Sequence, residues 1–137
     1  MDHAPARAAE LPSGARRLRA VRGATTVARD EPAAVLAATR ELLDTLLDRN
    51  ALAPRDVVSV IVTTTRDVTS ADPSDAVRAP GWERVPVLCM SEIAVPDGLP
   101  LCVRVLLHVD VTDGAAPLEA VYLRSATALR PDLVARL

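Results

Sequence analysis

Two apolar runs between residues 85 and 109 place the strongest limits on the fold of this chain. Each run has the length of a buried strand and is bounded by Pro or Gly, and residues 96–98, Pro-Asp-Gly, have the composition of a turn. We therefore expect two strands that this turn brings together. Two charged residues, Glu92 and Arg104, interrupt the runs and are expected to lie close in space. A structural ion pair and a functional pair would both explain them.

The composition limits the size and the class of the protein. A chain of 137 residues is long enough for one domain, and without Phe its core must be built from Ala, Val and Leu. The net charge of −2 argues against a nucleic-acid-binding protein, which would present a basic face. No apolar run reaches the roughly 18 to 20 residues that span a membrane, so we expect no membrane partner.

The cysteines and histidines indicate a compartment and argue against a metal site. Cys89 and Cys102 both lie inside apolar runs, and residues 1–17 lack the apolar region of a signal peptide. This combination predicts reduced thiols in a cytoplasmic protein. His3 and His108 are far apart in the sequence and no metal-ligand spacing is present, so we expect no metal.

The order of periodic segments predicts an α/β (α+β) protein. The clearest element is a helix that Asp30 caps and that ends at Asn50, because Leu and Val recur at helical spacing between them. A strand at 18–27 is interrupted by Gly23, which predicts either a bulge or a close approach of another element. The other expected elements are a strand at 57–65, a loop at 66–80 with a short helix near 75–79, the two strands of the opening stretch, a helical piece at 113–118 and a strand at 121–129.

These elements make a single domain with one principal helix. We assign the domain to residues 18–133, between a flexible extension at 1–17 and a tail at 134–137. One helix cannot cover both faces of a mixed sheet of about five strands. A second copy of the chain is expected to supply the missing cover, so the pattern predicts a homo-oligomer.

Six short motifs, taken in order, resemble the AroH-class chorismate mutases over residues 18–133. They are VRGATTV with Arg22, AVR with Arg78, GW followed by VPVLCMSEI with Cys89 and Glu92, LCVRVLLHV with Arg104, VYL with Tyr122, and ALRPDL with Leu129 and Arg130. Each motif alone is weak, but six with family-like spacing make a specific signal. The resemblance implies a single-domain pseudo-barrel, a homotrimer, no cofactor, and conversion of chorismate to prephenate in aromatic amino acid biosynthesis, on the shikimate pathway.

The resemblance also implies a site at each boundary between subunits. From one subunit it takes Arg22, Arg104 and Tyr122, from the next Arg78, Cys89 and Glu92, and it adds Leu129 and Arg130 as substrate-binding residues. Chorismate is a dianion whose unimolecular rearrangement leaves negative charge on the ether oxygen and positive charge on the ring. Arg104 would stabilise the oxygen, and Glu92 with Cys89 would hold the ring hydroxyl and balance the ring charge.

The remaining residues of this set would position the substrate. Arg22 and Tyr122 would grip one carboxylate, and Arg78 would clamp the other from a mobile loop. These roles are what the resemblance implies, because the residue types alone do not assign them.

The loop at 66–80 departs from the family pattern. Asp72 and Asp75 stand where the family usually has an aromatic residue and a lysine, and Arg66 stands where it commonly has proline. Each carboxylate near the entrance would repel a dianion by roughly 1 kcal/mol per charge pair. Either these side chains point to solvent, or the loop is retuned for a less anionic or larger substrate. A noncatalytic carboxylate-binding module is a third interpretation, against which the costly inner charges argue.

Overall fold

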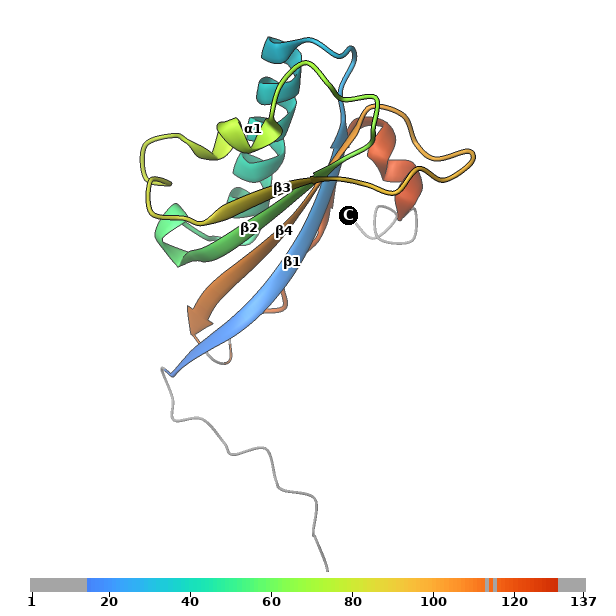
Figure 1. Ribbon diagram of the computed structural model, residues 1–137. Coiled ribbons are helices and arrows are strands. Elements are labelled where there is room, and N and C mark those ends of the chain that lie inside the picture. The colour runs from blue at the N-terminus through green and yellow to red at the C-terminus, as the bar shows by residue number, and fades with distance from the viewer. Residues whose placement is uncertain (1–14, 113, 115, 131–137) are drawn as a thin grey trace, which may run out of the picture.

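The computed structural model describes residues 15–112, 114 and 116–130. These residues form a five-stranded mixed sheet with one long helix, α1, across one face (Figure 1), which confirms the expected fold class. The elements are β1 (Arg16–Thr26), α1 (Pro32–Arg49), η1 (Pro54–Asp56), β2 (Val57–Thr64), η2 (Pro73–Val77), β3 (Val87–Ser91), β4 (Cys102–Thr112), β5 (Val121–Tyr122) and η3 (Arg124–Leu129). No helix in this part of the chain is long and apolar enough to cross a membrane.

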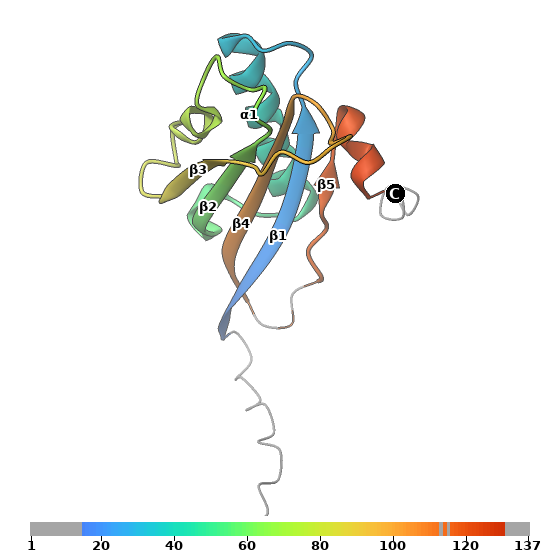
Figure 2. The same cartoon turned by 45° about the vertical axis from the view of Figure 1, so that its right-hand side comes forward.

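The strands lie side by side in the order β3-β2-β4-β1-β5 (Figure 2). β4 is antiparallel to β1 and to β2, whereas β3 is parallel to β2 and β5 is parallel to β1. The prediction that the turn at 96–98 joins two paired strands is wrong, because β2 lies between β3 and β4. A parallel pair needs a long crossover, and residues 65–86, which contain η2, connect β2 to β3.

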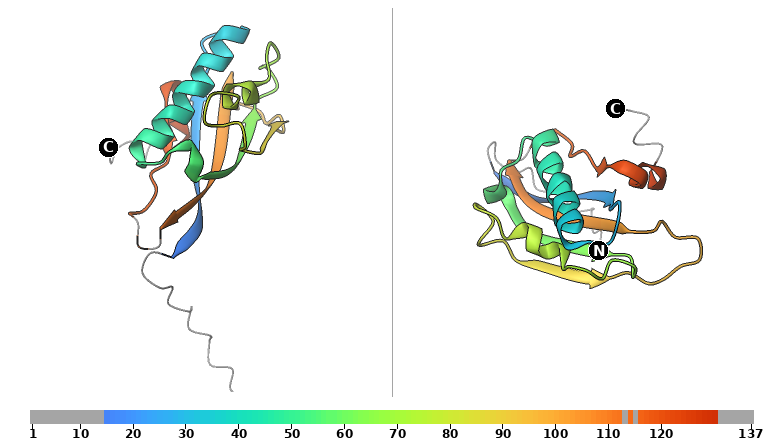
Figure 3. Two further views of the ribbon diagram at one scale, coloured as in Figure 1. Left: turned by 90° about the vertical axis from the view of Figure 1, so that its left-hand side faces the viewer. Right: turned by 90° about the horizontal axis from the view of Figure 1, so that it is seen from above.

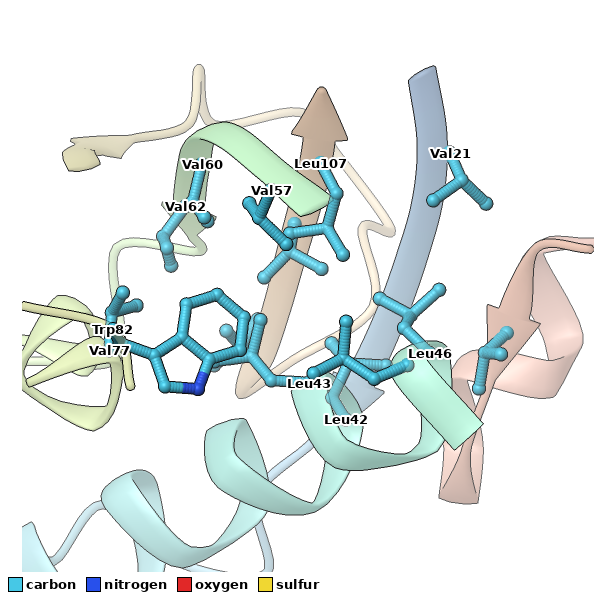
Figure 4. Packing of buried hydrophobic residues seen from close by; sticks show 14 of the residues in the cluster. Val21, Leu42, Leu43, Leu46, Val57, Val60, Val62, Val77, Trp82 and Leu107 are labelled. Atoms are coloured by element: carbon cyan, nitrogen blue, oxygen red, sulfur yellow. The ribbon is translucent and has the colours of Figure 1, made fainter. Parts of the chain in front are cut away.

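Figure 3 shows α1 lying along one face of the sheet, and the core fills the space between them. Every second residue of β4 points to this face and is buried: Val103, Val105, Leu107, Val109 and Val111. Leu42, Leu43 and Leu46 of α1 are completely buried against the sheet. Trp82 lies beside Val77 of η2 and closes the core at that side (Figure 4). The face under α1 is therefore fully covered within one chain.

Gly23 marks a close approach and not a bulge. The pairing of β1 with β4 runs without a shift over all 11 residues of β1. A Cβ atom on Gly23 would lie 2.8 Å from Cδ1 of Leu46 and 3.2 Å from the carbonyl oxygen of Val121. The missing side chain therefore lets α1 pack directly on β1.

Asp30 does not cap α1, so that prediction is wrong. The N-cap residue is Glu31, and no side chain forms a capping hydrogen bond there. The Asp30 carboxylate instead accepts hydrogen bonds from Ser70 N at 3.0 Å and from Thr69 N and Oγ1 at 3.0 and 2.7 Å. Hydrogen bonding from Ser70 and Thr69 lowers the pKa of Asp30 to about 2. The Asp30 carboxylate therefore binds donors that are distant in the sequence, and these hydrogen bonds connect the segment before η2 to the start of α1.

The last strand is shorter than the sequence pattern predicts. Only Val121 and Tyr122 pair with β1, and the backbone then turns at Arg124, whose φ is +53°. The backbone N–H of Ser125 donates to Oγ1 of Thr26 at 3.2 Å, which places η3 over the end of β1. The expected strand at 121–129 is therefore two residues of strand followed by a 3-10 helix.

The remaining differences concern short segments near the ends of elements. β1 begins at Arg16, two residues earlier than expected, because Arg16 pairs with Thr112 of β4. Residues 116–120 are not helical, contrary to the helix expected at 113–118, and residues 113 and 115 lie outside the described part. Most of the expected extension, residues 1–14, and the expected tail at 134–137 also lie outside it.

Candidate active site

A row of side chains crosses the sheet on the face opposite α1. The strand register aligns Tyr122 of β5, Ala24 of β1, Arg104 of β4, Thr63 of β2 and Met90 of β3. Paired residues of neighbouring strands point to the same face, so these five side chains share one face of the sheet. The residues on either side of Arg104 in β4 are buried under α1, so the row lies on the opposite face, which we call the uncovered face because α1 does not cover it, although η3 covers Ala24 and Tyr122 there.

Glu92 and Arg104 form an ion pair at this row. Oε2 of Glu92 lies 3.2 Å from Nε of Arg104, with side-chain exposures of 21% and 34%. Thr63 Oγ1 donates a hydrogen bond to the same Oε2 at 2.6 Å, and the Glu92 backbone N–H donates to the Thr64 carbonyl oxygen at 2.8 Å. The predicted proximity of Glu92 and Arg104 is therefore confirmed, although β2 and not a shared turn brings them together.

A cavity of about 260 Å³ opens beside this ion pair. Its lining comprises Arg104, residues 65–67 after β2, and parts of the loop from Glu92 to Pro100. The Asp67 carboxylate holds the base of this loop, since it accepts hydrogen bonds from Thr65 Oγ1 at 2.5 Å and from Leu101 N at 2.9 Å. A larger cavity, about 420 Å³, lies between the end of α1 and residues 116–119, and no predicted site residue lines it.

Arg22, Tyr122 and Leu129 lie near this site within the same chain. Arg22 is exposed and pairs with Leu106, two residues from Arg104 in β4, so both arginines share the uncovered face as diagonal neighbours. Tyr122 is buried in a small cluster to which Leu129 of η3 also belongs. Arg130 follows directly as the C-cap residue of η3.

Cys89 faces away from Arg104. It pairs with Val62 of β2, which is buried under α1, whereas the next residue, Thr63, pairs with Arg104 on the other face. Burial, and after it the negative charge of Asp72, raises the pKa of the Cys89 thiol to about 11. One chain therefore cannot bring Cys89 to the same ligand as its own Arg104.

The expected grouping of Glu92 with Cys89 needs correction. It placed Glu92 on the other side of a subunit boundary from Arg104, but the two side chains of one chain contact each other. Glu92 directly follows β3, and its carboxylate accepts a hydrogen bond from Thr63 near the end of β2. Cys89 lies within β3 and keeps the opposite orientation.

The segment around η2 is packed and is not an open loop. Ser74, Ala76 and Val77 are buried, and Nη2 of Arg40 in α1 donates a hydrogen bond to the Ala76 carbonyl oxygen. Asp72 is the N-cap residue of η2: its Oδ1 accepts from Ser74 N at 2.9 Å and from Ser74 Oγ at 2.6 Å. These bonds lower the pKa of Asp72. The short helix thus begins two residues before the expected one, because Asp72 caps it.

Arg78 lies at this packed segment, apart from the cavity beside Arg104. Its Nε is 3.4 Å from Oδ1 of Asp75, and both side chains are largely exposed. The structure therefore divides the predicted residues into two groups. Arg22, Glu92, Arg104, Tyr122 and Leu129 form one group, whereas Arg78 and Cys89 lie near η2.

Sequence reasoning missed Thr63 as the residue that holds Glu92. Residues 63–65, three threonines at the end of β2, were a possible signal in the sequence. Only the strand register shows that Thr63 points to the uncovered face. Within the described residues, no group of three or more His, Cys, Asp and Glu side chains could hold a metal ion. The charged side chains that line the cavity are Arg66, Asp67, Glu92 and Arg104.

Comparisons with known proteins agree with this geometry. A family model for chorismate mutase type I matches residues 18–133. The chorismate mutase AroH of Bacillus subtilis (strain 168) is 40% identical over 117 residues, which cover 85% of this chain and 92% of that protein. The chorismate mutase AroH of Thermus thermophilus is 44% identical over 117 residues, which cover 85% and 96%.

A solved structure shares the fold as well. The chorismate mutase from Clostridium thermocellum superimposes with a TM-score of 0.76 at 37% sequence identity, covering 80% of this chain and 98% of that one. The matched segment contains both groups of site residues described above. The chain therefore belongs to the chorismate mutase type I family.

Proposed function

We propose that this chorismate mutase converts chorismate to prephenate in sites that two neighbouring copies of the chain build together. The observation that carries the proposal is the Glu92-Arg104 pair at the wall of a cavity, with Arg22 on the same face. The reaction is a unimolecular isomerisation, so the site must restrain the substrate and balance charge. It needs neither a nucleophile nor a proton shuttle.

The charge pair suits the transition state better than the substrate. Breaking the ether bond ahead of forming the new carbon–carbon bond puts partial negative charge on the ether oxygen, and Arg104 stabilises it there. The ring becomes partly positive, and Glu92 stabilises the ring. Both side chains are partly buried, so these interactions are less screened than in water. Glu92 contacts Arg104 at Nε. The far edge of the guanidinium group therefore remains for the ligand.

A neighbouring copy supplies Arg78 and Cys89. Two observations support this division: Cys89 points away from Arg104 in one chain, and among the described residues only η3, at the β1-β5 side, packs on the sheet face that carries Arg104. Large apolar side chains are exposed on that face, with Leu88 at 66% and Met90 at 46%. Apolar side chains exposed on an uncovered face support burial against another copy. We propose a homotrimer, in which each boundary between copies forms one site.

In this arrangement the other site residues position the dianion. Arg22 binds one carboxylate together with the hydroxyl of Tyr122, and Arg78 of the neighbouring copy binds the other. The Cys89 thiol, whose raised pKa keeps it neutral near pH 7, contacts the ring hydroxyl. Leu129 and Arg130 border the substrate from η3.

We place the reaction in aromatic amino acid biosynthesis. A cytoplasmic location is supported by two free thiols, Cys89 and Cys102, inside the sheet.

Substitution of Arg104 tests this function. Arg104→Ala removes the cation from the ether oxygen and is expected to lower kcat by about 100-fold to 1,000-fold, as loss of one preorganised donor does. The assay follows the loss of chorismate absorbance and identifies prephenate by mass. Arg55→Ala is the matched control, because Arg55 is an exposed arginine in η1, at the opposite end of β2. Near-parental turnover by folded Arg104→Ala would disprove the assignment.

One observation favours a second candidate function, in which the enzyme acts on a substrate that is less anionic or larger than chorismate. Asp75 pairs with Arg78 and so weakens the clamp on a second carboxylate. Absence of prephenate with the parent protein, together with turnover of a related monoanion, would favour this candidate. Binding of chorismate without any turnover would instead favour the noncatalytic carboxylate-binding module.

A further inference from the structure

The cavity beside Glu92 and Arg104 is lined by another arginine, Arg66, that the family resemblance does not assign to the site. We propose that Arg66 adds a further guanidinium contact to one of the two carboxylates of the substrate, beside Arg22 or the neighbouring copy's Arg78, and thereby sets the affinity for the dianion. This inference rests on the proposed function, because it takes the same cavity as the place where the substrate lies.

The charges around the cavity leave Arg66 available to a ligand. Four ionisable side chains line it: Arg66, Asp67, Glu92 and Arg104. Glu92 and Arg104 pair with each other at 3.2 Å. Both oxygens of Asp67 are occupied, Oδ1 by Thr65 Oγ1 and Oδ2 by the backbone N–H of Leu101. Among the described residues, no carboxylate forms an ion pair with Arg66, so its charge is uncompensated at the cavity.

The backbone that carries Arg66 is held in place. The preceding residue, Thr65, donates its backbone N–H to the Cys102 carbonyl oxygen at 3.0 Å and accepts from Cys102 N at Oγ1 at 2.9 Å. A turn closes behind Arg66, since Val68 N donates to the Thr65 carbonyl oxygen at 3.1 Å. Arg66 therefore has a fixed Cα position next to β4, and binding a ligand orders only its side chain.

The chemistry of the ligand follows from this arrangement. A guanidinium binds a carboxylate through two parallel N–H···O bonds, and it does so most strongly when no protein carboxylate competes. A dianion that places one charge near Arg104 would enter a cavity whose lining carries two positive and two negative side chains. Of the two arginines in this lining, Arg104 shares its charge with Glu92, whereas Arg66 has no ion pair with a carboxylate of the described residues.

The affinity of the variant Arg66→Gln tests the inference. We expect the KM for chorismate to rise by about 5-fold to 20-fold, because a charged hydrogen bond at a partly exposed position is lost. The kcat should change by less than about 2-fold, since Arg66 binds a carboxylate that keeps its charge during the reaction. Arg66→Lys keeps the charge and should recover part of the affinity, but not the two-bond geometry.

The matched control is Arg55→Gln, which removes the same charge at an exposed position far from the cavity. An unchanged KM in Arg66→Gln, or a rise equal to that of Arg55→Gln, would overturn the inference while leaving the proposed function intact. Calorimetric titration of each variant with chorismate measures affinity without turnover. A parent protein that binds but does not react would overturn the function alone, and one that does not bind would overturn both.

Discussion

The two faces of the sheet differ in what covers them. The face under α1 is apolar and is covered within the single chain. Leu42, Leu43 and Leu46 are completely buried against it, and Gly23 allows α1 to pack closely on the strands. The opposite face carries the Glu92-Arg104 pair and leaves Leu88 and Met90 exposed. One face thus holds the core of the single chain, and the other carries the charges and leaves apolar side chains exposed. A substitution should therefore affect folding or activity according to the face on which it lies.

The largest effect is expected from a charge on the uncovered face. Leu88→Glu replaces an exposed apolar side chain with one that cannot be buried against another copy. The single chain should still fold, but sedimentation should show monomers, and turnover should fall by at least about 100-fold because each site lacks its second half.

Ala37→Glu is the control for this variant, because Ala37 is exposed on the outer side of α1. Its assembly and turnover should match those of the parent protein. A fully active Leu88→Glu monomer would show that one chain builds the whole site, and the difference between the two faces would lose its functional meaning.

A smaller effect is expected from Gly23→Ala on the covered face. The new methyl group would lie 2.8 Å from Leu46 Cδ1 and 3.2 Å from the Val121 carbonyl oxygen, so the Leu46 side chain must move and the backbone at Val121 must give slightly. We expect the free energy of unfolding to fall by about 1 to 3 kcal/mol, as in other overpacked cores. Denaturant titration measures it, and turnover per folded molecule should stay unchanged. Equal stability to the parent protein would show that α1 does not need this contact.

The smallest effect concerns the pH dependence of stability on the α1 side. Hydrogen bonds lower the pKa of Asp30 to about 2, so its contribution is complete above the usual pKa and is lost as the pH falls toward 2. The melting temperature of the parent protein should therefore fall more steeply between pH 4 and pH 2 than that of Asp30→Asn. Asp44→Asn, at an exposed position of α1, is the control. Parallel curves for Asp30→Asn and the parent would contradict this role.

The sequence pattern predicted the helices and strands more accurately than it predicted which strands pair with each other. Helical spacing placed the helix at Pro32–Arg49 closely, and β-branched residues placed the strand at Val57–Thr64. The pairing of strands was wrong, because a turn signal at 96–98 does not reveal that β2 lies between the two runs. Asp30 was misassigned for a similar reason, since its partners lie 39 and 40 residues away. Local patterns record local preference, but long-range pairing depends on the whole fold.

For the candidate site, the sequence predicted the proximity of Glu92 and Arg104 but not how the candidate residues divide between the two faces of the sheet. Glu92 and Arg104 were expected to be neighbours and they are, with Thr63 as the unforeseen support. The capping of η2 by Asp72 was not predicted, whereas its expected effect on a dianion stays a prediction. These outcomes depend on backbone and hydroxyl donors whose positions a sequence does not show.

Active-site complementation tests the shared site most directly. Arg104→Ala removes one half of the site and Arg78→Ala removes the other, so each variant alone should be nearly inactive. When equal amounts are unfolded and refolded together, about a quarter of the boundaries should combine two intact halves by random assembly. Turnover of the mixed protein is expected to rise to about a quarter of the parental value. Turnover that stays at the average of the two separate variants would contradict a site built by two copies.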